Sequence, residues 1–247
     1  MTTERREMDV QTADGTAHAW LFRGAQGAGP AVLLYPDAFG VRPATQQMAE
    51  RLAGLGYVVL LPDVFYRAGD YPPFGTDAFS NPPERARLMA LIRTLTQERI
   101  RMDSAAYLDA LSAQPGVRAD RVGVTGYCMG GRMAFLTAAL HPDRVRAAAA
   151  FHPGGLVTEA PESPHRLSGQ VKAALYLGVA DDDAGFSPEH QATLASALGA
   201  AHVDYCLELY QGKRHGFAVP DSAAAYDQDA AERHWRRLAV FFGERLG

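Results

Sequence analysis

The chain has 247 residues, of which 47% are hydrophobic and 21% charged, and these values exclude disorder for the bulk of a protein long enough to bury a sizeable core. The formal net charge is −4 and the basic residues form no block among the acids, so nucleic acid is not an expected partner. No apolar run approaches the ~18 residues of a membrane span, and no apolar segment follows the charged N-terminus, which predicts a cytoplasmic protein without membrane contact.

Short apolar strands alternate with segments of helical period along the chain, which is typical of an α/β fold. Asp14-Gly15 lies between two extended segments and predicts an antiparallel N-terminal hairpin at one edge of a mostly parallel central sheet. The remaining strands are predicted, in chain order, at residues 31–35, 57–61, 122–125, 147–151, 173–178 and 203–210. Helices on both faces of the sheet are predicted at residues 45–55, 84–111 (one bent helix or two), 132–140 and 227–246.

The segment 65–83 is rich in Tyr, Pro, Gly and Phe and has no helical or strand period. It is interpreted either as a loop that covers part of a pocket or as a wrap around the core. Because the chain contains neither an internal repeat nor a stretch of linker composition, a single domain over residues 1–247 is expected.

The window 121–131 carries the clearest chemical signal, because an apolar strand runs into Gly126-Tyr127-Cys128-Met129-Gly130 and then into a helix. This pattern is typical of a nucleophile elbow with Cys in place of Ser, where glycines two residues before and after the nucleophile leave room for a tight turn. The free amides at the start of the helix favour a thiolate at Cys128. The alternatives are a buried structural cysteine and a dinucleotide fingerprint, and the glycine spacing disagrees with the second.

A cysteine nucleophile needs a base, and His215 alone among eight histidines lies on the loop between the last predicted strand and the final helix. His152 ends the strand beside the elbow and is a candidate for the pocket lining. An acid that orients the base is expected after the strand 173–178, where Asp181, Asp182 and Asp183 compete and position alone does not choose. The order Cys, Asp, His is that of the α/β-hydrolase fold. No His-Glu-x-x-His or paired Cys-x-x-Cys pattern occurs, so neither metal nor cofactor is expected.

Three motifs together make the chain resemble the dienelactone hydrolase family over nearly its whole length: Gly126-Tyr127-Cys128-Met129-Gly130-Gly131, His215-Gly216-Phe217 and Pro36-Asp37-Ala38-Phe39-Gly40. In that family a Cys-His-Asp triad opens ester or lactone bonds through an acyl-enzyme. The resemblance implies the α/β-hydrolase fold and assigns these roles to Cys128 and His215.

The resemblance also implies the remaining members of the site. Alignment on the segment before Pro188 favours Asp183 as the triad acid, with Asp181 as the second choice. The backbone amides of Ala38 and Met129 are implied as the donors of an oxyanion hole.

Two positions depart from the family pattern. Asp37 stands where the family usually has Glu, and Val219 stands where dienelactone hydrolases carry an Arg that grips the substrate carboxylate. Arg42, Arg67 and Arg132 are candidate replacements for that arginine, although each is expected to be a surface or ion-paired residue.

These observations predict a hydrolase that cleaves a small ester or lactone, other than dienelactone itself, through an acyl-enzyme on Cys128. Asp37 and His152 are expected to lie in the substrate pocket, and a small-molecule ester or lactone is the expected partner. One alternative is a hydrolase-fold binding or regulatory protein without turnover. Another is a thiol redox protein, but Cys128 has no nearby partner and Cys206, in a predicted strand, is expected to be buried.

Overall fold

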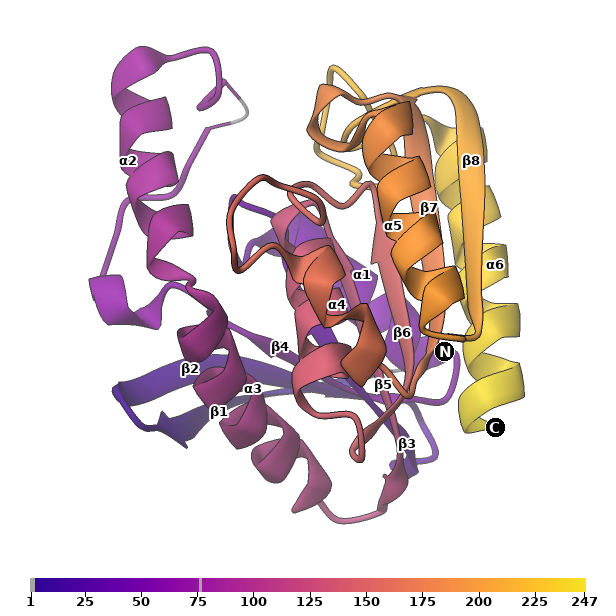
Figure 1. Cartoon of the computed structure of the whole chain (residues 1–247). Coiled ribbons are helices and arrows are strands. Elements are labelled where there is room, and N and C mark those ends of the chain that lie inside the picture. The colour runs from indigo at the N-terminus through magenta and orange to yellow at the C-terminus, as the bar shows by residue number, and fades with distance from the viewer. Residues whose placement is uncertain (1–2, 76) are drawn as a thin grey trace.

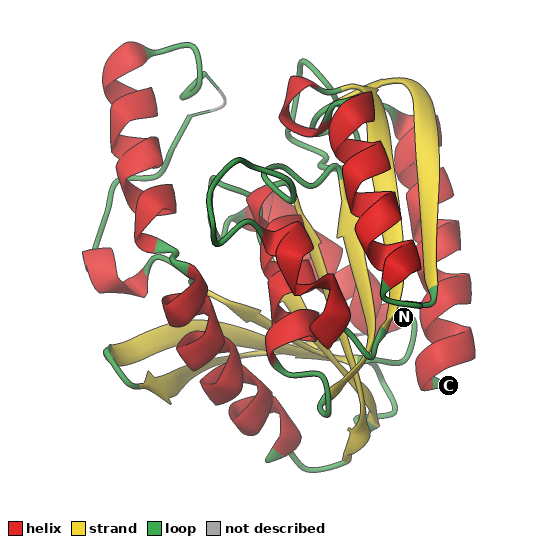
Figure 2. Cartoon of the chain, in the orientation of Figure 1, coloured by secondary structure: helices red, strands yellow, loops and turns green. Residues whose placement is uncertain are grey.

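The computed structural model describes residues 3–75 and 77–247, which build one eight-stranded sheet with helices on both faces (Figure 1, Figure 2). The strand order across the sheet is β1-β2-β4-β3-β5-β6-β7-β8. In chain order the strands are β1 (Glu4–Thr12), β2 (Gly15–Arg23), β3 (Gly29–Tyr35), β4 (Val58–Pro62), β5 (Val117–Tyr127), β6 (Val145–Phe151), β7 (Ala174–Asp182) and β8 (Tyr205–Arg214).

The predicted N-terminal hairpin is confirmed. β1 and β2 pair antiparallel with Thr12 opposite Gly15, and β2 continues antiparallel against β4. Gly15 has φ +135°, a conformation that side chains disfavour, which explains why the turn contains glycine. All later pairings are parallel, so the sheet is mixed and mostly parallel as expected.

Six helices and three short 3₁₀ segments accompany the strands in the described part of the chain, and the last helix follows the last strand. They are α1 (Pro43–Gly54), η1 (Tyr66–Ala68), α2 (Pro82–Thr94), α3 (Gln97–Ser112), α4 (Met129–Leu140), η2 (Pro164–Gln170), η3 (Ala184–Phe186), α5 (Pro188–Ala200) and α6 (Gln228–Leu246). The long helical segment predicted at 84–111 is thus two helices. α2 ends at Leu95, whose ψ of 65° leaves the helical region, and the Thr96 side chain caps α3 by accepting a hydrogen bond from the Arg99 amide.

Two hydrophobic cores lie on the two faces of the sheet. One contains buried side chains of α3, α4 and α5, and the other contains those of α1 and α6. Neighbouring strand residues alternate between the cores, as Leu33 in the first and Val32 in the second illustrate, because successive side chains of a strand point to opposite faces. α2 lies apart from the sheet in Figure 1 and has Leu88 as its one buried residue.

The aromatic segment 65–83 serves both of the purposes considered for it. Phe65 and Phe74 are buried in the core, so this part of the segment wraps the domain. Phe79 is 48% exposed and lines a pocket, together with Asp77. α2 begins within the last residues of the segment.

The expectation of a buried Cys206 is wrong, because its side chain is exposed. β8 is one of the two edge strands of the sheet, and most of its residues are exposed or half-buried. A short apolar run therefore identified the strand correctly but not its place at the edge. Within the part of the chain that the structure describes, no helix has the length and apolar character needed to cross a membrane.

Candidate active site

A pocket with a volume of about 270 Å³ lies at the carboxyl ends of the parallel strands. β3 has β4 on one side and β5 on the other, so the chain reverses its direction of winding there, which is where open α/β sheets place their sites. The lining comes from the loops after β3, β5, β6 and β8 and from the aromatic segment: Asp37, Ala38, Phe39, Asp77, Phe79, Cys128, His152, His215, Gly216, Asp221, Ser222, Ala223 and Ala224.

Cys128 occupies the turn between β5 and α4 with φ 57° and ψ −118°, a strained backbone conformation for a residue with a side chain. A Cβ atom added at Gly126 would overlap the Gly130 carbonyl oxygen, and one added at Gly130 would overlap the carbonyl oxygens of Tyr35 and Pro36. Both glycines are therefore required for the close approach of α4 to the sheet. This geometry is that of a nucleophile elbow.

Two backbone amides near Cys128 are free to bind an anion. Ala38 follows β3, and Met129 is the first residue of α4. Among the hydrogen bonds of the described residues, neither amide donates to another group. The positive end of the α4 dipole also lies at Met129. The two amides implied by the resemblance are thus unoccupied donors: Ala38 lines the pocket, and Met129 directly follows Cys128, which also lines it.

Asp183 is the one of the three competing aspartates that reaches His215. The His215 Nδ1 donates a hydrogen bond of 2.7 Å to the Asp183 Oδ2, and the Asp183 Oδ1 accepts one of 2.8 Å from the Gly185 amide. Asp183 is buried, whereas Asp181 and Asp182 are exposed. Asp181 instead accepts a hydrogen bond from the Gly212 amide. The geometry therefore favours Asp183 as the orienting acid.

The electrostatic surroundings of His215 favour its charged form. Burial by itself lowers the pKa of this imidazole, but its interactions with Cys128 and with the Asp183 carboxylate outweigh the burial and raise the pKa to about 11. A thiolate beside an imidazolium is the form in which a cysteine nucleophile is reactive.

Asp37 lies in the pocket wall, but its carboxylate is bound to Arg42. The Arg42 guanidinium donates two hydrogen bonds of 2.6 and 2.8 Å to Asp37 and two of 2.7 Å each to Asp221. The Asp37 Oδ1 also accepts a hydrogen bond from the Phe39 amide. This Asp37-Arg42-Asp221 bridge joins the loop after β3 to the loop after β8. The sequence analysis missed Asp221, because nothing in the local sequence marks a contact 179 positions away from Arg42.

The sequence profile of the dienelactone hydrolase family matches residues 18–246. The chain belongs to the dienelactone hydrolase family. A carboxymethylenebutenolidase of Rhodococcus opacus is 31% identical over 228 residues, covering 89% of this chain and 83% of the relative. Two solved structures, each covering all of both chains with a TM-score of 0.85, are m3DLH at 26% identity and the dienelactone hydrolase-like promiscuous phosphotriesterase P91 from metagenomic libraries at 24%. The family and these names make the protein a hydrolase with the α/β-hydrolase fold.

None of the arginines considered as a carboxylate clamp lines the described pocket. Arg42 is held in the bridge, and Arg67 is paired with Asp14 and Asp103. Arg132 makes no ion pair among the described residues, and burial lowers its pKa, but it does not line the cavity either. Val219 is buried and also lies outside the lining. The described lining therefore holds no arginine that could bind a substrate carboxylate.

His152 reaches the pocket lining, as its position at the end of β6 indicated. It is 1% exposed, and its ring centroid lies 5.1 Å from that of His215. Within residues 3–75 and 77–247, no group of three or more His, Cys, Asp or Glu side chains is arranged to hold a metal ion.

Proposed function

We propose that this hydrolase cleaves a small ester or lactone through a covalent acyl-enzyme on Cys128. The observation that supports the proposal is the convergence, in one pocket, of a cysteine on a strained elbow with a histidine whose far nitrogen is bound to a buried carboxylate. This is the arrangement that nucleophilic catalysis requires, because the nucleophile needs a base and the base needs an orienting group.

In the acylation step the Cys128 thiolate adds to the carbonyl carbon, and the developing negative oxygen accepts hydrogen bonds from the amides of Ala38 and Met129. The bond from that carbon to the leaving oxygen then breaks, and His215 gives its proton to this oxygen. Deacylation reverses the roles: His215 takes a proton from water, the water oxygen bonds to the acyl carbon, and the carbon–sulfur bond breaks. Asp183 holds the imidazole by Nδ1 and stabilises its charge throughout.

The pocket favours a small, uncharged substrate. Its volume of about 270 Å³ is just below the usual range for ligand pockets, roughly 300–1,000 Å³. The described lining includes the aromatic rings of Phe39 and Phe79 and three aspartates, but no lysine or arginine. The charge of His215 is already paired with Cys128 and Asp183, so a substrate with its own carboxylate would meet three aspartates and no other cation in the described lining. The proposed partner is therefore a neutral small-molecule ester or lactone.

Brief mixing with p-nitrophenyl acetate, followed by intact-mass and peptide-mapping mass spectrometry, tests the proposal. The expected result is an acyl adduct on Cys128 that decays while nitrophenolate continues to form. Cys128→Ala should give neither the adduct nor turnover. Because Cys206 is exposed and able to react without catalysis, Cys206→Ala is the matched control and should behave as the wild type.

Two outcomes would contradict the proposal. A folded Cys128→Ala protein that hydrolyses esters at the wild-type rate would exclude the covalent mechanism. A wild-type protein that forms no adduct with aryl or alkyl esters and lactones, yet retains such a ligand unchanged, would instead support a binding protein that has the hydrolase fold without turnover.

A further inference from the structure

Among the described residues that line the pocket, His152 is the one with buried side-chain nitrogen or oxygen atoms that lack a hydrogen-bond partner. Both ring nitrogens lack a hydrogen-bond partner, although the residue is only 1% exposed. Burying a polar group without a hydrogen-bond partner destabilises a protein. A buried imidazole at the wall of a pocket is therefore placed to receive a hydrogen bond from whatever the pocket binds.

The backbone fixes the position of His152. Its φ is +38°, which is rare for a residue with a side chain, and its amide donates a hydrogen bond of 2.7 Å to the Gly178 carbonyl oxygen of β7. Cys128 is also at positive φ, and the two residues line the same cavity. Strained residues of this kind persist where the surrounding structure holds them in place.

The neighbours of the ring keep it neutral and leave its nitrogens free. Its centroid lies 5.3 Å from that of Phe217 and 6.0 Å from that of Tyr127, whose hydroxyl is bonded to His234. Burial, followed by the positive charge of His215, holds the pKa of His152 well below its usual range. A neutral imidazole offers one N–H donor and one acceptor nitrogen.

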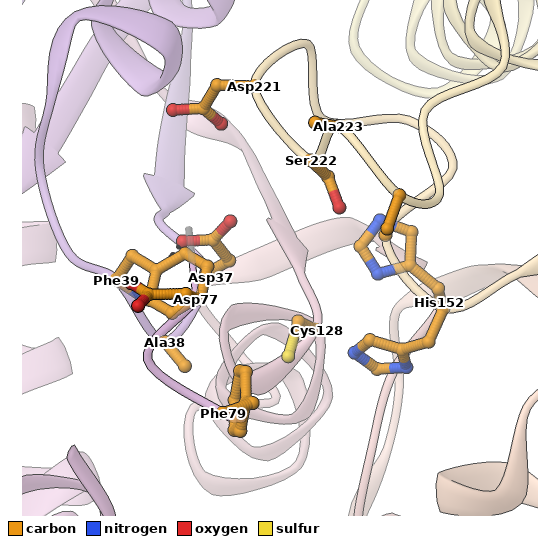
Figure 3. Close-up of a pocket in the computed structure, with 13 residues that line it drawn as sticks. Asp37, Ala38, Phe39, Asp77, Phe79, Cys128, His152, Asp221, Ser222 and Ala223 are labelled. Atoms are coloured by element: carbon orange, nitrogen blue, oxygen red, sulfur yellow. Dashed lines mark hydrogen bonds between the residues drawn. The ribbon is translucent and has the colours of Figure 1, made fainter. Parts of the chain in front are cut away.

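Figure 3 shows Cys128 between two sides of the pocket, with Asp37 and Ala38 on one side and His152 on the other. The amide of Ala38 belongs to the side proposed to bind the carbonyl oxygen. The group that exchanges its proton with His215 must lie on the histidine side, where the centroids of His152 and His215 are 5.1 Å apart.

We infer that His152 hydrogen-bonds the oxygen that exchanges a proton with His215, which is the leaving oxygen of the ester during acylation and the water oxygen during deacylation. One site serves both oxygens, because the second half of the reaction reverses the first. His152 is neither protonated nor deprotonated in either step: it holds the oxygen while His215 moves the proton. This inference rests on the proposed hydrolysis at Cys128 and adds a group that contacts the substrate.

Single-turnover experiments on wild type, His152→Phe, His152→Asn and His152→Gln test the inference. Nitrophenolate release from p-nitrophenyl acetate reports acylation, and intact mass reports deacylation. Phe keeps a ring of similar size without nitrogens, whereas Asn and Gln return an amide near Nδ1 and Nε2, respectively. His202→Phe is the matched control, because His202 is also a histidine at positive φ but lies outside the pocket lining.

The expected result is that His152→Phe slows deacylation about tenfold while Asn or Gln restores most of the rate. The acylation defect of His152→Phe should be larger for an alkyl ester than for the nitrophenyl ester, since a poor leaving oxygen depends more on hydrogen bonding. The thermal midpoint of the Phe variant should not fall, because two unpartnered nitrogens are removed.

Deacylation of His152→Phe at the wild-type rate would overturn the inference, as would an equal slowing of the Phe, Asn and Gln variants, which would point to ring packing alone. If the Phe variant does not fold, the inference requires Asn and Gln to differ in deacylation rate, and equal rates overturn it. Absence of any adduct on wild-type Cys128 is a separate outcome, which would contradict the proposed function itself.

Discussion

The loop after β3 and the end of β6 flank Cys128 from opposite sides (Figure 3). The two sides differ in whether their polar side chains are hydrogen-bonded. On the first side every oxygen of the Asp37 carboxylate accepts a hydrogen bond, and Arg42 is bidentate to both of its partners. On the second side His152 is buried with two unpartnered nitrogens. The Asp37 carboxylate is thus fully hydrogen-bonded before a substrate arrives, and the His152 ring is not.

The difference shows how a small pocket can be prepared for a developing charge, with a fully hydrogen-bonded carboxylate on one side and a neutral imidazole on the other. The side that contains the hydrogen-bonded Asp37 carboxylate, here called the paired side, fixes the backbone around Ala38. The Ala38 amide is therefore already in place when the carbonyl oxygen becomes negative. The side that contains His152 offers a neutral imidazole. A leaving oxygen or a water molecule would form the hydrogen bonds that this imidazole lacks.

Among changes beside Cys128, as opposed to the loss of Cys128 itself, the largest loss of activity is expected in Asp183→Asn. The amide cannot stabilise an imidazolium as the buried carboxylate does, and it also disturbs the tautomer that Nδ1 donation enforces. We expect kcat to fall about 10³-fold with little change in KM. The control is Asp181→Asn, which removes an exposed carboxylate near the same strand end and should retain activity. If Asp181→Asn lost more activity than Asp183→Asn, the assignment of the acid would be wrong.

The protonation state of His215 is expected to depend on Cys128. With the thiolate and Asp183 present, the pKa of His215 is raised to about 11, so the imidazole keeps its charge at pH 8 and loses it only as the pH rises through that value. In Cys128→Ala the largest cause of the rise is removed while burial still lowers the pKa, so the midpoint must move down. NMR titration of the His215 ring nitrogens in both proteins measures this, and equal midpoints would contradict the proposed ion pair.

Much of the fold follows from patterns that are local in sequence. The turn at Asp14-Gly15, the apolar strands and the glycines around Cys128 each depend on residues within a few positions of one another, and all were predicted. The break between α2 and α3 was left open, because helical period continues across Leu95 and Thr96. Cys206 was misjudged because whether a strand lies at the edge depends on the topology of the whole sheet.

In the candidate site too, the features that could be predicted are those that depend on nearby residues in the sequence. Cys128, His215 and His152 were located because each ends or follows a parallel strand, and such ends meet at one edge of the sheet. Three adjacent aspartates could not be distinguished by position, since the choice depends on which side chain turns inward. The bridge through Asp221 and the unpartnered state of His152 arise from packing between distant segments, and no short motif encodes them.

Arg42→Gln tests the paired side. It leaves Asp37, which is nearly buried, without its countercharge, so we expect the free energy of unfolding to fall by about 2–3 kcal/mol and kcat to fall as the loop around Ala38 loosens. The matched control is Arg51→Gln, because Arg51 is also bidentate to one carboxylate, that of Glu232, but both side chains are more than 40% exposed. That change should cost at most about 1 kcal/mol. Equal losses in chemical denaturation would show that the Arg42 bridge is an ordinary surface contact.

The smallest effect is expected from the charge of the substrate. Asp37 and Asp221 share the single guanidinium of Arg42, and Asp77 adds an exposed carboxylate at the rim, so the described lining is net negative. Dimethyl succinate should therefore be hydrolysed with a kcat/KM about threefold higher than that of its singly charged monomethyl ester. Asp77→Asn and added salt should each narrow the difference, because both weaken the same repulsion. A preference for the charged ester would instead require a cation to reach the acyl group, and Arg132, which makes no ion pair among the described residues, would be the first arginine to replace.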